Sequence, residues 1–212
     1  MLDFSASGME CFLRISRRPC WCIIILGMYP DRASTHYRNI YLDDHIHFFT
    51  CSIVGFLPVL EVDPMKQLLL DSWNIYREKY NVLIHGYVIM PEHIHILLYA
   101  DMGVQIRSFI QQSLRLSAIT ILEKVRGLPE YKRIPILDKF KHYANGRAKY
   151  KIWKEQARGI PLDKEKYVVQ RLNYIHENPV RRELVKNPLD YLYSSYRNYE
   201  LDDQSVFRID KI

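Results

Sequence analysis

Cysteine, glycine and proline are scarce in this sequence of 212 residues, and no apolar run is long. Four cysteines, three of them within the first 22 residues, are too few and too crowded for a disulfide framework. None belongs to a paired Cys-x-x-Cys arrangement of the structural zinc type, so we predict reduced thiols and a cytoplasmic location. Eight glycines and ten prolines exclude collagen-like and low-complexity chains.

The longest apolar run, residues 21–28, is far shorter than the roughly 20 residues that a membrane-spanning helix needs, so no membrane association is expected. Arginines before it imitate the basic start of a signal peptide, but no small-residue cleavage site follows. We interpret residues 1–35 as an N-terminal extension, with Met28 as an alternative start. A β-strand at a sheet edge over residues 20–26 is the other interpretation.

Positive charge is concentrated in one segment. The whole chain carries a net charge of +6, whereas residues 124–158 alone contain eleven Lys or Arg and only three acids. Five aromatic residues are interleaved with these charges, a composition typical of a surface that neutralises phosphates and stacks unpaired bases. A solvated basic loop with its aromatic residues in the core remains an equal alternative. The DNA contacts predicted in this segment are Lys139, Lys141, Arg147, Lys149 and Lys151.

Alternation and β-branched or aromatic residues predict three strands, over residues 46–54, 82–90 and 93–100. Pro91-Glu92 is typical of a tight turn, so the last two strands are expected to form a hairpin. The strands belong to one domain that we place at residues 36–200, followed by a tail at 201–212.

Apolar residues at helical spacing predict helices over 63–80 and 104–125. Asp63 is expected to cap the first of these, with Pro64 at its first helical position. Asp163 is expected to cap a third helix that ends at Asn178-Pro179, and a last aromatic helix or loop covers 188–199.

His93 and His95 lie two residues apart on a predicted strand, so both imidazoles project from the same face and can supply two ligands of a metal site. Two half-buried histidines beside a turn are the alternative, because His45 and His47 have the same spacing. The context favours the later pair, which follows a tight turn and opens an apolar strand.

Residues 170–179 contain a second set of polar side chains. On a helix, Gln170, Tyr174 and Asn178 share one face, which aligns a phenol with two carboxamides. The chain has sixteen tyrosines, and most tyrosines are structural, so this pattern alone does not identify a nucleophile.

Two stretches of the sequence resemble a known family, the REP-associated tyrosine transposases of the HUH single-strand transposase superfamily. Residues 87–98, Tyr-Val-Ile-Met-Pro-Glu-His-Ile-His-Ile-Leu-Leu, resemble its histidine strand with the preceding Met-Pro turn. Residues 173–182, Asn-Tyr-Ile-His-Glu-Asn-Pro-Val-Arg-Arg, and the aromatic stretch 191–197 are similar to its tyrosine helix and C-terminal signature. Together with Trp-Lys-Glu at 153–155, the resemblance spans about residues 40–200.

The resemblance implies an α+β fold, namely a ferredoxin-like antiparallel sheet with helices packed on one face and a tyrosine-bearing helix near the C-terminus. It implies that His93 and His95 bind a divalent cation, Mg²⁺ or Mn²⁺, and that Tyr174 is the nucleophile. The third ligand in the family lies one helical turn after the tyrosine, which is Asn178 here. Glu177 and Gln170 are its local competitors.

The implied partner is single-stranded DNA with a REP-like hairpin, bound by a monomer or a homodimer. Arg181 and Arg182 are expected to join the basic segment in contacting it. The tyrosine would form a 5′-phosphotyrosine and free a 3′-hydroxyl, with the metal activating the scissile phosphate because an unperturbed phenol is a poor nucleophile at neutral pH. Nitrogen ligands tilt the metal preference toward Mn²⁺.

Two other functions fit parts of the pattern. The first is a non-catalytic module that binds single-stranded nucleic acid through residues 124–158 without a metal. The second is a zinc hydrolase built on the two histidines, but the sequence has neither a helical His-Glu-x-x-His motif nor an obvious third His or Cys ligand.

Overall fold

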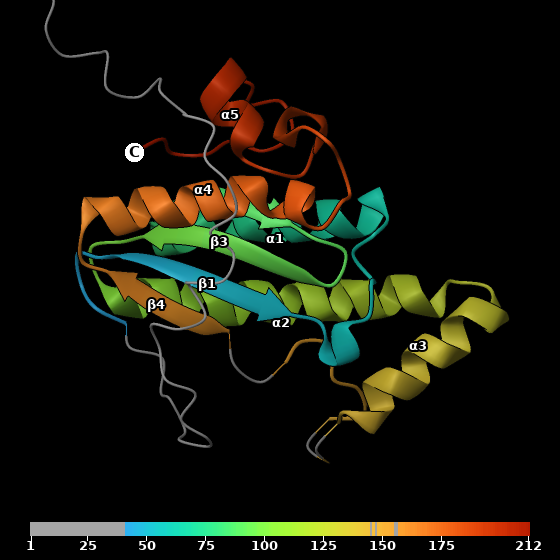
Figure 1. The fold of residues 1–212 in the computed structure, drawn as a ribbon. Helices are drawn as coiled ribbons and strands as arrows, with labels where there is room; N and C mark the ends of the chain where they lie inside the picture. Colours follow the sequence, from blue (N-terminus) through green and yellow to red (C-terminus); the bar gives the residue numbers. More distant parts are fainter. Residues whose placement is uncertain (1–40, 145, 147, 155–156) are drawn as a thin grey trace, which may run out of the picture. The chain divides into compact units, whose positions relative to one another are not determined.

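A computed structural model describes residues 41–144, 146, 148–154 and 157–212, which belong to one unit spanning residues 38–212 (Figure 1). The predicted extension at residues 1–35 and the alternative strand at 20–26 lie outside the described residues. In chain order the elements are β1 (Ile46–Ser52), η1 (Val54–Phe56), α1 (Asp63–Tyr80), β2 (Leu83–Ile89), β3 (His93–Tyr99), α2 (Gly103–Arg126), α3 (Glu130–His142), β4 (Arg158–Leu162), α4 (Glu165–Arg181), η2 (Pro188–Asp190) and α5 (Tyr196–Leu201).

The four strands form one sheet in the order β2-β3-β1-β4, and every neighbouring pair is antiparallel. β1, α1 and β2 form one β-α-β unit, β3, α2 and β4 form a second, and each unit has a strand of the other between its own two. This arrangement is the ferredoxin-like split β-α-β fold, so the predicted α+β class is confirmed. β4 was not predicted, because its Arg-Gly-Ile-Pro-Leu sequence is a poor strand former that is tolerated at a sheet edge.

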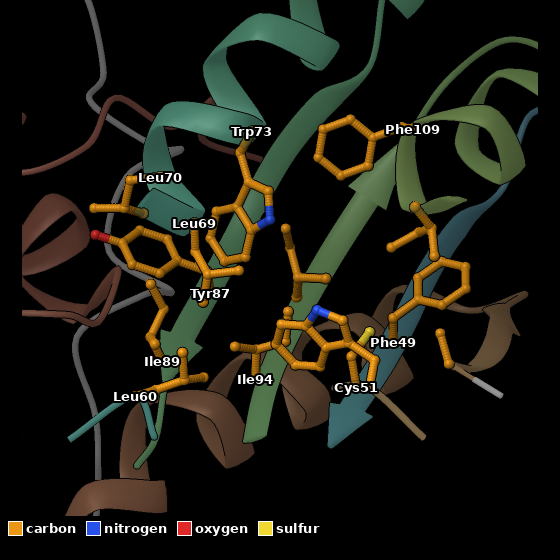
Figure 2. Packing of buried hydrophobic residues seen from close by; sticks show 14 of the residues in the cluster. Phe49, Cys51, Leu60, Leu69, Leu70, Trp73, Tyr87, Ile89, Ile94 and Phe109 are labelled. Carbon is orange, nitrogen blue, oxygen red and sulfur yellow. The ribbon is translucent and has the colours of Figure 1, made fainter. Parts of the chain in front are cut away.

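Side-chain alternation along the strands creates two different faces. Ile94, Ile96 and Leu98 of β3 point toward α1 and α2 and belong to the larger of two buried apolar clusters. Figure 2 shows Trp73 of α1 and Phe109 of α2 in the same cluster. Because the odd-numbered residues of β3 point the other way, this core leaves His93 and His95 on the opposite face.

The opposite face is covered by α4. Val168 and Ile175 of this helix pack on Phe48 and Leu97 of the sheet. The family resemblance implies helices packed on one face of the sheet. α1 and α2 do share a face, while the tyrosine-bearing helix lies on the other (Figure 1). The helix α4 packs closely on the sheet at Gly86 of β2, where an added Cβ would lie 2.6 Å from a methyl carbon of Leu172.

Four details of the helices differ from the sequence predictions. The N-cap of α4 is Lys164 and not Asp163, and no side chain caps this helix. α1 is capped by the backbone of Val62, and Asp63 lies inside its first turn, where it pairs with Lys66. α4 continues through Asn178 and Pro179 to Arg181, because its packing on the sheet offsets the one hydrogen bond that the proline removes. Residues 130–142 form α3, a helix with basic residues in its last turn, where they complement the helix dipole.

The C-terminal segment closes the free edge of β2. The backbone N–H of Ile89 donates to Tyr193, and that of Ser195 donates to Tyr87. Phe207 and Ile209, in the region predicted as a tail, are buried in the larger apolar cluster. Among the described residues, no helix is both long and apolar enough to cross a membrane.

Cys51 is the cysteine that the described part of the chain contains, and it is a buried free thiol. Burial raises the pKa of this thiol to about 12, so it stays protonated and unreactive at neutral pH. The other three cysteines lie outside the described residues.

Candidate active site

The start of β3 brings two imidazoles together under α4. The ring centroids of His93 and His95 are 4.7 Å apart and the rings are nearly perpendicular. Their partners on β1 are Ser52 and Thr50. The spacing of two residues therefore places both rings on one face of the sheet, as expected from strand geometry.

His95 carries an unusual unpaired atom. The side chain is buried, and its Nδ1 lies 2.9 Å from Thr50 Oγ1. In the part of the chain that the structure describes, its Nε2 is the one buried side-chain nitrogen or oxygen without a hydrogen-bond partner. A buried polar atom left unpaired costs free energy, so this atom calls for a ligand.

The protonation state of His95 suits a metal ligand. Burial lowers its pKa to about 3, and the nearby charges of His93 and Arg171 act in the same direction. The ring is therefore neutral at physiological pH. With Nδ1 donating to Thr50, the lone pair lies on Nε2, the arrangement in which an outer hydrogen bond fixes the ligating nitrogen.

His93 is held by a carboxylate. Its Nδ1 lies 3.2 Å from Glu92 Oε1, which also accepts a hydrogen bond of 2.8 Å from Arg182. Glu92 is buried although it is charged, and Arg182 offsets that charge. Burial lowers the pKa of His93 and the Glu92 carboxylate opposes this shift. Glu92 thereby orients the ring so that Nε2 is available for a ligand.

Tyr174 of α4 lies directly against this pair. Its ring centroid is 5.2 Å from that of His95 in an edge-to-face arrangement and 6.2 Å from that of Phe48. The guanidinium carbon of Arg181 lies 5.1 Å from the centroid of the same ring. The tyrosine and the two histidines, 79 and 81 residues apart in the sequence, are thus neighbours.

Asn178 follows Tyr174 by one helical turn and is buried. Glu177 and Gln170, the other candidates for a third ligand, are exposed. Across the described residues, no three His, Cys, Asp or Glu side chains converge as a metal site. Two neutral imidazoles, one with an unpaired buried nitrogen, and an amide oxygen nevertheless fit a divalent cation such as Mn²⁺.

The residues predicted to contact DNA fall into two groups. Arg181 and Arg182 lie close to the histidine pair. Arg181 contacts the ring of Tyr174, and Arg182 forms an ion pair with Glu92. The others lie on α3 and the segment after it: Lys139, Lys141, Lys149 and Lys151. Arg147 lies outside the described residues.

The second histidine pair, His45 and His47, differs from the first in its hydrogen bonds. His47 is fully buried, its Nε2 accepts the backbone N–H of Leu42, and its Nδ1 donates to the carbonyl of His45. His45 Nδ1 donates to the carbonyl of Asp43. Both ring nitrogens of His47 are therefore used by the fold, in contrast to Nε2 of His95.

Four residues of the site were not singled out from the sequence: Phe48, Thr50, Glu92 and Arg171. Thr50 meets His95 because of the register between β1 and β3, which no local pattern specifies. The guanidinium carbon of Arg171 lies 5.0 Å from the ring centroid of Phe48, which itself stacks on His95. Of these four residues, only Glu92 is indicated by the sequence, because it directly precedes His93.

Replacing Glu92 by glutamine is expected to weaken Mn²⁺ binding by about 10-fold, since loss of an outer-shell carboxylate typically costs that much. The amide keeps the size of the side chain but loses the charge that Arg182 and His93 share. Calorimetric titration of the two proteins with Mn²⁺ measures the change. The matched control is Glu61→Gln at an exposed position, and equal affinities of the two variants would contradict the role of Glu92.

The fold and the site together define a ferredoxin-like α+β protein that carries a histidine pair beneath a tyrosine-bearing helix. No protein-family model and no curated protein matches the chain. Among solved structures, a REP-associated tyrosine transposase bound to a REP hairpin matches 84% of this chain and 92% of its own, with 18% identity and a TM-score of 0.60. A protein from Deinococcus radiodurans R1 described as a transposase also matches, over 69% of this chain and 96% of its own, with 18% identity and a TM-score of 0.40. The chain therefore shares the fold of a REP-associated tyrosine transposase, as the sequence resemblance implies.

Proposed function

We propose that the protein is a metal-dependent endonuclease and strand transferase that cuts and rejoins single-stranded DNA beside a hairpin, with Tyr174 as its nucleophile. One observation carries this proposal: the unpaired, buried Nε2 belongs to His95, whose ring lies 5.2 Å from that of Tyr174. A neutral imidazole nitrogen free to bind a metal beside a phenol is the arrangement that metal-assisted attack on a phosphate requires.

His93, His95 and Asn178 would hold the cation, which supplies electrophilic assistance to the scissile phosphate when it is bound. The phenolic oxygen of Tyr174 forms a bond to phosphorus while the bond from phosphorus to the 3′-oxygen breaks. The phenol loses its proton and the departing 3′-oxygen gains one. Attack of a 3′-hydroxyl on the phosphotyrosine reverses these changes, so rejoining needs no external energy source.

Arg181 contributes a fixed positive charge. Its guanidinium lies against the ring of Tyr174, where it stabilises the negative charge that develops on the phosphate. Arg171, whose guanidinium carbon lies 5.0 Å from the ring centroid of Phe48, adds a second positive charge near His95. Both charges help to bind DNA before the reaction as well.

The hairpin partner is proposed by analogy with the REP-associated tyrosine transposase of the same fold, whose structure contains a REP hairpin. The test is to incubate the protein with a labelled hairpin that carries a single-stranded flank, in Mn²⁺ or in EDTA. We expect a covalent protein–DNA adduct that survives denaturation in Mn²⁺ and is missing in EDTA. Binding without any adduct in either condition would replace this proposal by the non-catalytic binding module.

Reversing the charges of Lys149 and Lys151 is expected to weaken binding of the single strand and to flatten its salt dependence. Each lost contact with a phosphate reduces the slope of log K against log salt by about 0.7, so two lost contacts reduce it by about 1.4. Fluorescence anisotropy at several salt concentrations measures this slope. The double variant Lys79→Glu and Lys211→Glu, outside residues 124–158, is the control, and equal slopes for the two double variants would exclude this segment as a DNA track.

A further inference from the structure

Phe56, in the turn that follows β1, is a large aromatic side chain that is 59% exposed. Its backbone has φ of 51°, in the left-handed region that is unfavourable for a phenylalanine, and the preceding Gly55 also has a positive φ. A residue persists in this conformation only when its surroundings hold it, and such residues cluster at functional sites. Neither the exposure nor the conformation of Phe56 serves the core of the protein.

The turn is fixed to the site that holds the histidine pair. Ser52, the last residue of β1, is the register partner of His93. Immediately after it, the backbone N–H of Ile53 donates to the carbonyl of Glu92 over 2.9 Å. At the other end of the loop, Leu60 donates to Pro91 over 2.8 Å. The loop that carries Phe56 is therefore tied at both ends to the turn that precedes His93.

The basic segment, residues 124–158, also contacts the turn that carries Phe56. Val54 donates to the carbonyl of Ile152 over 2.8 Å, and the backbone N–H of Lys154 donates to Ser52 over 2.9 Å. The Nζ atom of Lys154 lies 3.3 Å from the ring centroid of Phe56, a close cation–π contact. The lysine thus supports one face of the ring and brings a positive charge to it.

A second aromatic side chain adjoins this turn. The ring of Tyr143, which follows α3, lies 3.0 Å from the position that a Cβ on Gly55 would occupy, and Tyr143 is 42% exposed. Exposed aromatic rings beside lysines are the elements from which proteins build sequence-tolerant sites for unpaired nucleotides. A single scattered apolar residue needs no explanation, but strain, a supporting cation and attachment to the histidine turn coincide here.

We propose that Phe56 and Lys154 form a stacking subsite for an unpaired base of the DNA strand that enters the site at His93. The ring stacks on the base, and the Lys154 ammonium neutralises an adjacent phosphate. This inference rests on the proposed function for its ligand class, single-stranded DNA. It adds a binding position outside the histidines, the tyrosine and the predicted DNA-contacting residues.

The test measures binding in EDTA, so that no cleavage intervenes, of a hairpin whose single-stranded flank contains 2-aminopurine. Phe56→Asn removes the ring and suits the left-handed backbone, so this variant should fold at least as well as the wild type. We expect its affinity for the flanked hairpin to fall about 5-fold to 150-fold, the range for loss of one stacked base, and the quenching of 2-aminopurine to disappear. Phe56→Tyr should keep the wild-type affinity and the quenching of 2-aminopurine. A blunt hairpin should bind the wild type, Phe56→Asn and Phe56→Tyr with equal affinity.

Three further variants sharpen the result. Phe56→Leu keeps an apolar side chain without a ring and should behave like Phe56→Asn. Tyr167→Ala, which removes an exposed aromatic residue on α4 outside the basic segment, should bind like the wild type. Lys154→Ala should reduce the salt slope by about 0.7, whereas Phe56→Asn should leave it unchanged.

Wild-type affinity in Phe56→Asn, or equal losses for flanked and blunt hairpins, would overturn the subsite. Loss of binding in Phe56→Leu and Phe56→Asn but not in Phe56→Tyr supports it. The subsite and the proposed chemistry fail separately: a protein that forms no adduct but still shows this ring-dependent binding has the subsite without the transferase. A wild type that binds neither hairpin overturns both.

Discussion

Replacing His95 by alanine is expected to abolish DNA cleavage while hairpin binding falls by no more than several-fold. The substitution removes the unpaired Nε2 that we assign to the cation, but it leaves the positive charges of Arg171, Arg181 and Arg182 in place. Affinity for a nucleic acid depends mainly on such phosphate contacts. Cleavage of a labelled hairpin in Mn²⁺ and anisotropy in EDTA measure the two properties separately.

His45→Ala is the matched control for this substitution. The ring of His45 lies at the edge of the preceding loop, where its Nδ1 donates to the carbonyl of Asp43, so its loss should leave cleavage at the wild-type level. Because His95 is buried against Phe48, His95→Gln serves as a second variant that leaves a smaller cavity, and it should also be inactive. Equal loss of cleavage in folded His45→Ala and His95→Ala proteins would show that the metal assignment is wrong.

Replacing Tyr174 by phenylalanine is expected to remove the covalent adduct completely. Phenylalanine keeps the edge-to-face contacts with His95 and Phe48 and the position under Arg181, so folding and Mn²⁺ binding should persist. It lacks the phenolic oxygen that we propose attacks phosphorus. Adduct formation on a denaturing gel, with calorimetric Mn²⁺ titration of the same protein, gives both readouts.

Tyr167→Phe tests the specificity of that result. Tyr167 lies on the same helix at an exposed position, so its hydroxyl can be removed without disturbing the core. Its adduct yield should equal that of the wild type. A residual adduct in Tyr174→Phe that disappears only when Tyr167 is also changed would move the nucleophile to the other tyrosine.

The sequence predicts the parts of this fold that local patterns encode. Alternation and helical spacing locate β1, β2, β3, α1 and α2, because each buries one regular apolar face. The spacing of His93 and His95 likewise fixes their common side of the sheet, and the spacing of Tyr174 and Asn178 fixes their common helix face. The histidine strand and the tyrosine-bearing helix together carry the histidine pair and Tyr174 of the candidate site.

The remaining features depend on contacts that are distant in sequence. Thr50 reaches His95 only through the register of β1 on β3, and Arg182 reaches Glu92 across 90 residues. β4 is stabilised by pairing with β1 and not by its own composition. The Asn178-Pro179 pattern predicts an end of α4 at that point, but contacts of the helix with the sheet extend it to Arg181.

The most direct test of the account is peptide mapping of the covalent adduct by mass spectrometry. After reaction with the hairpin in Mn²⁺, nuclease trimming and proteolysis, the account predicts a nucleotide attached through its 5′-phosphate to the peptide that contains Tyr174, with fragment ions that place it on that residue. A nucleotide on Tyr167, Tyr191 or any other residue would contradict the account, even if DNA cleavage itself were observed.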